Sequence, residues 1–217
     1  MITNVRTTNL VEPRLSRMNT LQPKYGKRLL RGVIAAALLP LLAGTAAAAQ
    51  DDLPQRMAKA RAAAGDFGAQ LLAGLQKAID AGGPVNAIGV CTTLAPEIAA
   101  EKSAAAQMSI GRTSLKLRQP RNAPDAWEQR QLENFETRKA AGENPATIEV
   151  GEFTEKDGKP VFRYMKAIPT APLCLSCHGA QIAPEVTTKL RELYPEDRAT
   201  GFAQGDLRGA FTITAPR

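Results

Sequence analysis

A dipeptide that favours tight turns separates two strand-like segments in the second half of this 217-residue chain. Residues 147–153 read TIEVGEF and residues 160–168 read PVFRYMKAI, and both segments are rich in β-branched and aromatic residues. Asp157-Gly158 lies between them, and Asp-Gly favours two-residue turns with positive φ at both positions. The pattern predicts an antiparallel β-hairpin, and the fold must therefore include an antiparallel sheet.

Helical segments surround this hairpin. Gly82-Gly83 should end the first helix, and Pro96 should kink or break the second. The order of elements favours an α+β fold, with a small antiparallel sheet and flanking helices in one domain. We expect helices over residues 50–82, 86–105, 125–141 and 186–195, and further strands after Met108 and over residues 206–216.

The first 49 residues have the layout of a secretory signal peptide. A basic stretch over residues 24–31 precedes an apolar run over residues 33–43, and an Ala-x-Ala cleavage signal follows at 47–49. The apolar run is shorter than the about 20 residues that span a bilayer. A start at Met18 would give a more typical leader. We expect export to the periplasm and no stable membrane insertion after cleavage; an uncleaved short anchor is the alternative.

Removing this leader changes the charge of the protein. The whole chain has 28 Lys and Arg against 21 Asp and Glu, a net charge of +7. Residues 1–49 hold seven of the basic and one of the acidic residues, so 21 basic and 20 acidic residues remain. A nearly neutral domain lacks the basic surface that nucleic-acid binding needs, and we expect no nucleic-acid partner.

The segment PLCLSCHGAQ, residues 172–181, holds two of the three cysteines and the only histidine of the chain. A thiol oxidoreductase or a plain disulfide could use Cys174 and Cys177, but redox pairs of this spacing usually begin a helix in a βαβ unit. A zinc site could use three cysteines and His178, but zinc knuckles usually supply two ligands from each of two segments. Neither alternative explains why the histidine directly follows the second cysteine.

Covalently attached haem explains the spacing best. Two residues between the cysteines let Cys174 and Cys177 form thioethers with the two vinyl groups of one porphyrin, and His178 then lies where the proximal iron ligand is needed. Export agrees with this cofactor, haem c. The second axial ligand stays open at this point, because no second histidine exists in the chain. Candidates are Cys91, Met57, Met108, Met165, Lys166 or an open position.

Four ordered motifs resemble one bacterial family. They are AIGVC at 87–91, IGRTSLKLRQPRNAPDAWE at 110–128, YMKAIPTAPLCLSCHG at 164–179 and YPEDRATGFAQGDLRGAFTI at 194–213. The family comprises c-type haem domains, long catalogued as a domain of unknown function, which are free-standing or attached to sensor kinases. The resemblance implies a PAS-like haem domain over residues 86–217, preceded by an N-terminal helix over 50–85 and the signal peptide over 1–49.

The resemblance also implies the ligand set. It assigns the thioethers to Cys174 and Cys177, the proximal ligand to His178 and the distal iron ligand to Cys91. Arginines of the same motifs are candidate contacts for the haem propionates, because guanidinium groups pair well with carboxylates. These arginines are Arg112, Arg118 and Arg208.

A thiolate ligand predicts a haem of low potential, because the negative charge of Cys91 favours ferric iron. If the sulfur leaves on reduction, the haem can report redox state or bind a diatomic gas, and we expect a redox or gas sensor. A low-potential periplasmic electron-transfer cytochrome is the alternative. We do not expect an enzyme, because the chain has no distal histidine for acid–base work on peroxide. Any signal or electron must pass to a separate protein partner.

Overall fold

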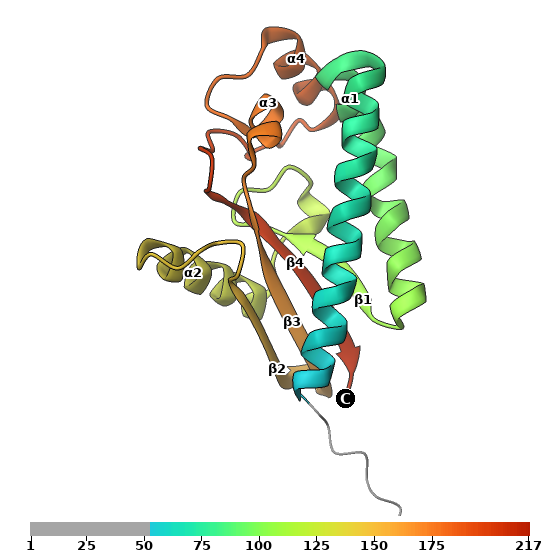
Figure 1. Cartoon of the computed structure of the whole chain (residues 1–217), viewed down its shortest axis with the longest axis vertical. Helices are drawn as coiled ribbons and strands as arrows, with labels where there is room; N and C mark the ends of the chain where they lie inside the picture. Colours follow the sequence, from blue (N-terminus) through green and yellow to red (C-terminus); the bar gives the residue numbers. More distant parts are fainter. Residues whose placement is uncertain (1–52) are drawn as a thin grey trace, which may run out of the picture. The chain divides into compact units, whose positions relative to one another are not determined.

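The computed structural model describes residues 53–217, which lie in one compact unit. The predicted signal peptide over 1–49 lies outside the described residues. Four strands form a single antiparallel sheet in the order β1-β4-β3-β2 (Figure 1). The strands are β1 (Ser109–Thr113), β2 (Glu149–Lys156), β3 (Lys159–Pro169) and β4 (Leu207–Pro216). The α+β, PAS-like layout predicted from the sequence, a small antiparallel sheet with flanking helices, is confirmed.

The predicted hairpin joins β2 to β3. Asp157 and Gly158 have φ values of 53° and 71°, and Lys156 pairs with Lys159 across the turn. Gly158 adopts this left-handed conformation without a steric cost, and Asp157 is one of the few other residue types that tolerate it. The turn therefore fixes the register of the two strands.

The long element α1 (Leu53–Ala106) is a helical hairpin with two antiparallel arms (Figure 1). Its backbone leaves the helical region at Gly82 and Gly83, and Gly83 has a φ of 73°. The stop predicted there is confirmed. The helix continues through Pro96, so the predicted break at that position does not occur. The arms approach closely, since a Cβ on Gly74 would lie 2.3 Å from the Leu94 side chain.

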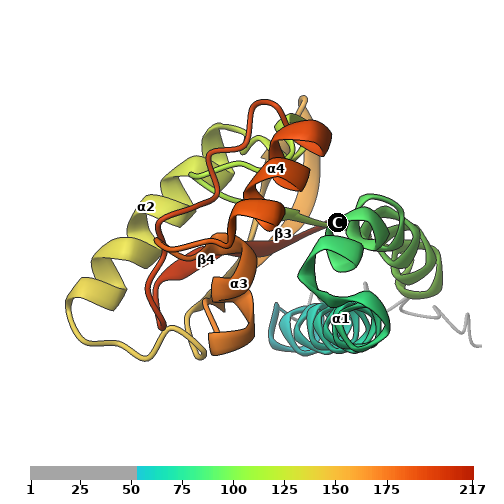
Figure 2. The ribbon, with the colours of Figure 1, turned by 90° about the horizontal axis from the view of Figure 1, so that it is seen from above.

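Helix α2 (Ala126–Ala140) starts at a capping box. The Asp125 carboxylate accepts hydrogen bonds from the backbone N–H groups of Trp127 and Glu128, and the Glu128 side chain accepts one from the backbone of Asp125. These bonds satisfy N–H groups that would otherwise lack a partner at the helix start. Figure 2 shows α2 on one side of the sheet and α1 on the other.

Strand alternation directs side chains into the two layers between sheet and helices. On β3, Phe162 and Tyr164 pack with Phe67 of the first α1 arm, whereas Met165 and Ala167 pack with the α2 cluster. Phe67 is 1% exposed, so the first α1 arm is an integral part of this domain and not a separate N-terminal helix. The domain boundary predicted at 85/86 lies just after the turn at Gly82 and Gly83, and it stays a prediction.

Short elements cover the end of the sheet that lies near the turn of α1 (Figure 1). After β3 come η2 (Pro172–Cys174), α3 (Leu175–His178) and α4 (Pro184–Leu193). Val186, Leu190 and Tyr194 pack against Ile88 of the second α1 arm. Within residues 53–217, no helix is both long enough and apolar enough to cross a bilayer.

Candidate functional site

The Cys-x-x-Cys-His segment forms a short helical turn directly after β3. Gly179 closes the turn by donating its N–H to the carbonyl oxygen of Leu175 at 2.9 Å. A Cβ on Gly179 would lie 2.6 Å from that same oxygen, so a larger residue cannot take its place without moving the backbone. The three side chains of Cys174, Cys177 and His178 all line one cavity.

The His178 ring is held in one tautomer by a loop 21 residues further along the chain. Nδ1 lies 2.6 Å from the carbonyl oxygen of Ala199. A carbonyl oxygen can only accept, so Nδ1 carries the proton and Nε2 keeps its lone pair. Nε2 lies 3.4 Å from both Arg118 Nη1 and Arg208 Nε, which agrees with an unprotonated nitrogen there. A histidine that donates Nδ1–H to a backbone carbonyl and keeps Nε2 unprotonated is the usual arrangement of a metal ligand.

The surroundings of His178 keep its imidazole neutral. Burial lowers the pKa of His178 to about 2, and the positive charges of Arg208 and Arg118 act in the same direction. Only the neutral ring can donate a lone pair to iron. The site thus holds the histidine in the protonation state that ligation requires.

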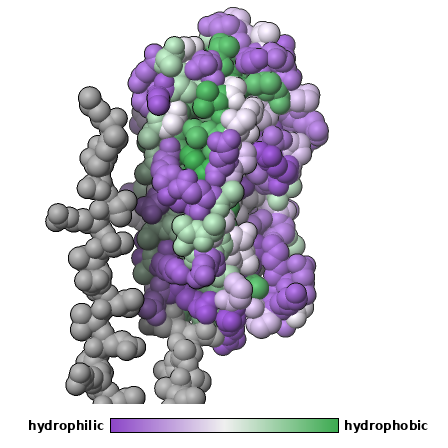
Figure 3. Space-filling model, turned by 90° about the vertical axis from the view of Figure 1, so that its right-hand side faces the viewer, coloured by the Kyte–Doolittle hydropathy of each residue, from purple (hydrophilic) through white to green (hydrophobic). Residues whose placement is uncertain are grey.

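The cavity has a volume of about 390 Å³ and lies between this turn and the helical hairpin. Apolar side chains from both arms of α1 line its other side, and Cys91 of the second arm is among them. Figure 3 shows hydrophobic surface on the upper half of the α1 side, and Leu72, a cavity-lining residue of the first arm, is 52% exposed. The arm residues that line the cavity are Gly68, Leu71, Leu72, Leu75, Ile79, Ile88, Cys91 and Ala95.

Cys91 is the candidate distal ligand that the structure brings to the cavity. Met165 is fully buried on the α2 side of the sheet, and Met108 and Met57 pack in the core between α1 and the sheet. Lys166 reaches the carbonyl oxygen of Ala146 instead. Burial raises the pKa of the Cys91 thiol, whereas the positive charges of Arg112 and Arg118 oppose this rise. Of the two candidates that spacing left level, Cys91 lines the cavity and Met165 does not.

The cavity also holds two arginines without a carboxylate partner among residues 53–217. Arg208 donates to Ser114 Oγ at 3.1 Å, and Arg112 lies over the ring of Phe67. Burial, together with the charges of Arg118 and Arg112, lowers the pKa of Arg208 to about 10. Burial also lowers the pKa of Arg112. Buried cations that repel each other favour an anionic ligand in the space between them.

Arg118, the third predicted propionate contact, has other partners. Its Nη2 lies 3.0 Å from Asp197 Oδ2 and donates to the Cys177 carbonyl oxygen at 2.5 Å. Its guanidinium is thus occupied by the protein itself. The role of Asp197 and of Ala199 was not predicted, although both lie in the quoted motif at 194–213. A backbone carbonyl leaves no signal in the sequence. The role of Asp197 depends on its contact with Arg118, which is 79 residues away in the chain and cannot be predicted from local sequence.

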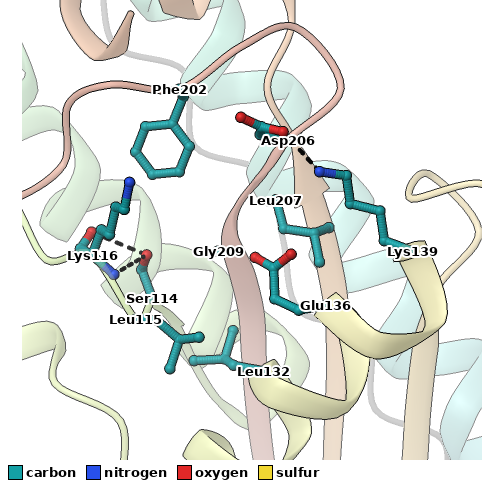
Figure 4. A pocket seen from close by; sticks show the side chains of 10 residues that line it. All are labelled: Ser114, Leu115, Lys116, Leu132, Glu136, Lys139, Phe202, Asp206, Leu207 and Gly209. Atoms are coloured by element: carbon teal, nitrogen blue, oxygen red, sulfur yellow. Dashed lines mark hydrogen bonds and ion pairs between the residues drawn. The ribbon is translucent and has the colours of Figure 1, made fainter. Parts of the chain in front are cut away.

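A second, smaller cavity is lined by Phe202 among other residues and has a volume of about 270 Å³. Its charged groups include the Lys139–Asp206 ion pair at 2.7 Å, and Lys116 extends toward the Phe202 ring (Figure 4). The ring of Phe202 is perpendicular to that of His178, with 6.2 Å between the centroids. Phe202 therefore lines this cavity and also contacts the imidazole.

The residues present fit the haem c that the sequence predicts. The cavity combines two thiols and an imidazole on one wall, a third thiol on the facing helix and unpaired arginines for two carboxylates. No three Cys, His, Asp or Glu side chains within residues 53–217 are clustered tightly enough to hold a metal ion, so the Cys₃His zinc arrangement is not formed there. No disulfide joins the three cysteines.

Fold and site together define an α+β domain with a cavity suited to an anionic prosthetic group, bordered by a Cys-x-x-Cys-His turn and a helical hairpin. The chain belongs to the Tll0287-like family, which it matches over residues 18–216. The solved structure of the cyanobacterial heme-protein Tll0287 is 24% identical to it, covering 76% of this chain and 96% of that chain with a TM-score of 0.58, which establishes a shared fold. No curated protein matches the chain. The resemblance to a haem domain family is thus confirmed.

Proposed function

We propose that this chain binds one covalently attached haem c and acts as a redox or diatomic-gas sensor, not as an enzyme. The observation that carries the proposal is the hydrogen bond from His178 Nδ1 to Ala199, because it leaves Nε2 unprotonated beside a cavity that Cys91 also lines. Membership of the Tll0287-like family, in which the cyanobacterial neighbour is described as a heme-protein, supports the choice of cofactor.

Each site residue has a separate task in this proposal. Cys174 and Cys177 carry the thioethers, and His178 Nε2 is the proximal ligand. Cys91, from the other side of the cavity, is the distal ligand. Arg208 and Arg112 neutralise the propionates, since neither has a carboxylate of its own among the described residues. When bound, the haem supplies a one-electron iron couple and, with one axial position open, a site for a diatomic gas.

The sensing role depends on the charge of Cys91. A thiolate stabilises ferric iron, and its advantage decreases when reduction removes one positive charge from the metal. The cavity wall around Cys91 is largely apolar. An anionic sulfur that is bound less strongly by reduced iron would therefore cost free energy there. Cys91 would hold the haem iron as a thiolate, and a bond weakened by reduction would favour the neutral thiol in this apolar wall. The redox state of the haem would thereby be linked to the helical hairpin that carries Cys91.

A low-potential electron-transfer cytochrome is the second candidate. Phe202 favours it, because this ring both contacts the imidazole of His178 and lines the second cavity. A partner bound there would be close to the proximal ligand. Exposure of the reduced protein to carbon monoxide separates the two functions. A sensor whose Cys91 leaves the metal binds the gas, and an electron carrier that retains both ligands excludes it.

The leader-like sequence of residues 1–49 supports export to the periplasm. Export would in turn agree with haem c, which is attached outside the cytosol. The mature protein would act on a separate redox or signalling partner, without nucleic acid and without stable membrane insertion. Mass spectrometry of the exported protein should find an N-terminus near Gln50. Intact leader on a folded, haem-free cytosolic protein would contradict both proposals.

Covalent attachment is tested on denaturing gels stained for haem, with protein matured in the periplasm. Wild-type protein should retain the stain, and the double variant Cys174→Ser, Cys177→Ser should lose it. The matched control is Cys91→Ser, which removes a cysteine without removing a thioether and should keep the stain. Complete extraction of haem from wild-type protein by acid–acetone would contradict the proposal.

A further inference from the structure

Asp197 lies in the loop between α4 and β4 and has two different partners. Its Oδ1 accepts a hydrogen bond from the backbone N–H of Ala199 at 2.8 Å. Its Oδ2 pairs with Arg118, at 3.1 Å from Nε and 3.0 Å from Nη2. The Asp197 side chain is 10% exposed and that of Arg118 is 14% exposed, so water screens this pair poorly. The carboxylate thus fixes a tight turn on one side and a cation on the other.

Both partners of Asp197 lead to His178. Ala199, whose N–H is held by Asp197, offers its carbonyl oxygen to His178 Nδ1 at 2.6 Å. Arg118, whose guanidinium is held by Asp197, donates to the carbonyl oxygen of Cys177, the residue directly before His178. One carboxylate therefore orients the groups that hold the imidazole ring and those that hold its backbone.

The same loop also forms backbone hydrogen bonds to His178 and to the residue that follows it. Phe202 donates its N–H to the carbonyl oxygen of His178 at 3.0 Å, and Gly201 donates to that of Gly179 at 2.9 Å. The loop from Asp197 to Phe202 thus contacts His178 through ring and backbone. Its end nearest Asp197 has no regular secondary structure, and the carboxylate contacts act together with the backbone hydrogen bond from the Arg198 N–H to the Leu117 carbonyl oxygen at 2.7 Å.

We infer that Asp197 is a positioning residue that sets the orientation and donor strength of the proximal histidine. A stronger Nδ1–H···O bond makes Nε2 a better donor to a metal, and this effect depends on where the Ala199 carbonyl points. The inference rests on the proposed function, because it concerns His178 as a ligand of the haem iron. It goes beyond the ligand set itself, and it assigns Arg118 to the same task rather than to the haem.

Two substitutions separate positioning from charge. Asp197→Asn removes the negative charge but keeps an oxygen that can accept from the Ala199 N–H. Asp197→Ala removes both. If Asp197 acted only through its charge, the two variants would raise the reduction potential of the haem equally and leave the ferric EPR spectrum unchanged. If Asp197 positions the ring, Asp197→Ala should raise the potential further than Asp197→Asn and should change the low-spin g-values.

Asp206 provides a matched control in the same loop region. Its carboxylate also combines a cation, Lys139 at 2.7 Å, with a backbone N–H, that of Ala203 at 2.8 Å, but neither partner is bonded to His178 (Figure 4). Asp206→Ala should therefore leave the EPR spectrum of the haem as in wild type. A change as large as that of Asp197→Ala would overturn the inference.

The experiment uses the full, haem-loaded protein, with the unfolding midpoint of each variant measured alongside. Asp197→Ser, whose hydroxyl makes the same turn more weakly, replaces Asp197→Ala if the latter does not fold. Spectra and potentials of Asp197→Ala or Asp197→Ser equal to those of Asp197→Asn would overturn the inference but leave haem binding intact. Absence of covalent haem from wild type would overturn the proposed function, and the inference with it.

Discussion

Gly209 and Thr113 approach each other so closely that a Cβ on Gly209 would lie 2.3 Å from the carbonyl oxygen of Thr113. Gly209 also has a φ of 154°, which side chains rarely permit. The contact lies where β4 passes the end of β1, and it joins two cavity residues. Ser114 follows Thr113, Arg208 precedes Gly209, and Ser114 Oγ donates to the carbonyl oxygen of Arg208 at 2.8 Å. The absence of a side chain at Gly209 thus allows the close approach of β4 and β1 that brings Arg208 to Ser114.

Gly209→Ala should destabilise the fold by about 2 kcal/mol or more, because it combines an unfavourable φ with a backbone clash. The matched control is Gly65→Ala on the first arm of α1, where an added Cβ meets nothing within 4 Å. Gly65→Ala should stabilise the protein by about 0.5–1 kcal/mol, as alanine does in a helix interior. Urea unfolding of both variants measures the two effects. Equal unfolding midpoints would contradict the claim that a side chain at position 209 is sterically unfavourable.

Asp125 should make the stability of the domain depend on pH in the acid range. Partial burial alone would raise its pKa, but the hydrogen bond from Arg163 and the backbone N–H of Glu128 lower the pKa from 3.8 to about 2. Since the folded pKa is lower than the unfolded one, this stabilisation is present above about pH 4 and is lost as the pH falls toward 2.

Asp125→Ala tests this expectation. At neutral pH the loss of the helix cap should cost about 1–2 kcal/mol in the free energy of unfolding. The difference from wild type should become smaller between pH 4 and pH 2, because wild type loses the same carboxylate contacts there. Asp66→Ala, on an exposed position of α1, is the control. A cost for Asp125→Ala that stays constant down to pH 2 would contradict the assignment.

Arg208 should raise the reduction potential of the bound haem. A buried positive charge beside the iron disfavours the ferric state, so Arg208→Met should lower the potential, and Arg208→Met with Arg112→Met should lower it further. Arg130→Met, an exposed position on α2, is the charge-matched control and should leave the potential unchanged. Potentiometric titration measures all three. An unchanged potential in the double variant would remove these arginines from the haem site.

Local signals in the sequence predicted much of this fold. Asp157-Gly158 and Gly82-Gly83 determine their turns through backbone preferences that belong to the residues themselves. Pro96 predicted a kink or a break in the second helix, and the helix continues through it without a break. Its neighbours Ala95 and Ile98 are buried.

The candidate site was predictable where the chemistry lies in consecutive residues. Cys174, Cys177 and His178 form such a group, and the structure places all three on one cavity wall. Spacing could not choose between Cys91 and Met165, because it does not show which of the two residues lines the cavity. The hydrogen-bond partner of His178 is the backbone oxygen of Ala199, and a pattern of side chains cannot predict such a partner.

The ferric EPR spectrum of Cys91→Ala, compared with wild type, tests most directly whether Cys91 and His178 ligate the same haem iron. Met165→Leu is the control, since Met165 was the competing candidate and lies fully buried on the α2 side of the sheet. Wild type and Met165→Leu should both show a low-spin signal with the narrow g-spread of thiolate ligation, and Cys91→Ala should lose it while keeping its covalent haem. A ferric signal that is the same in Cys91→Ala as in wild type would contradict the proposed site.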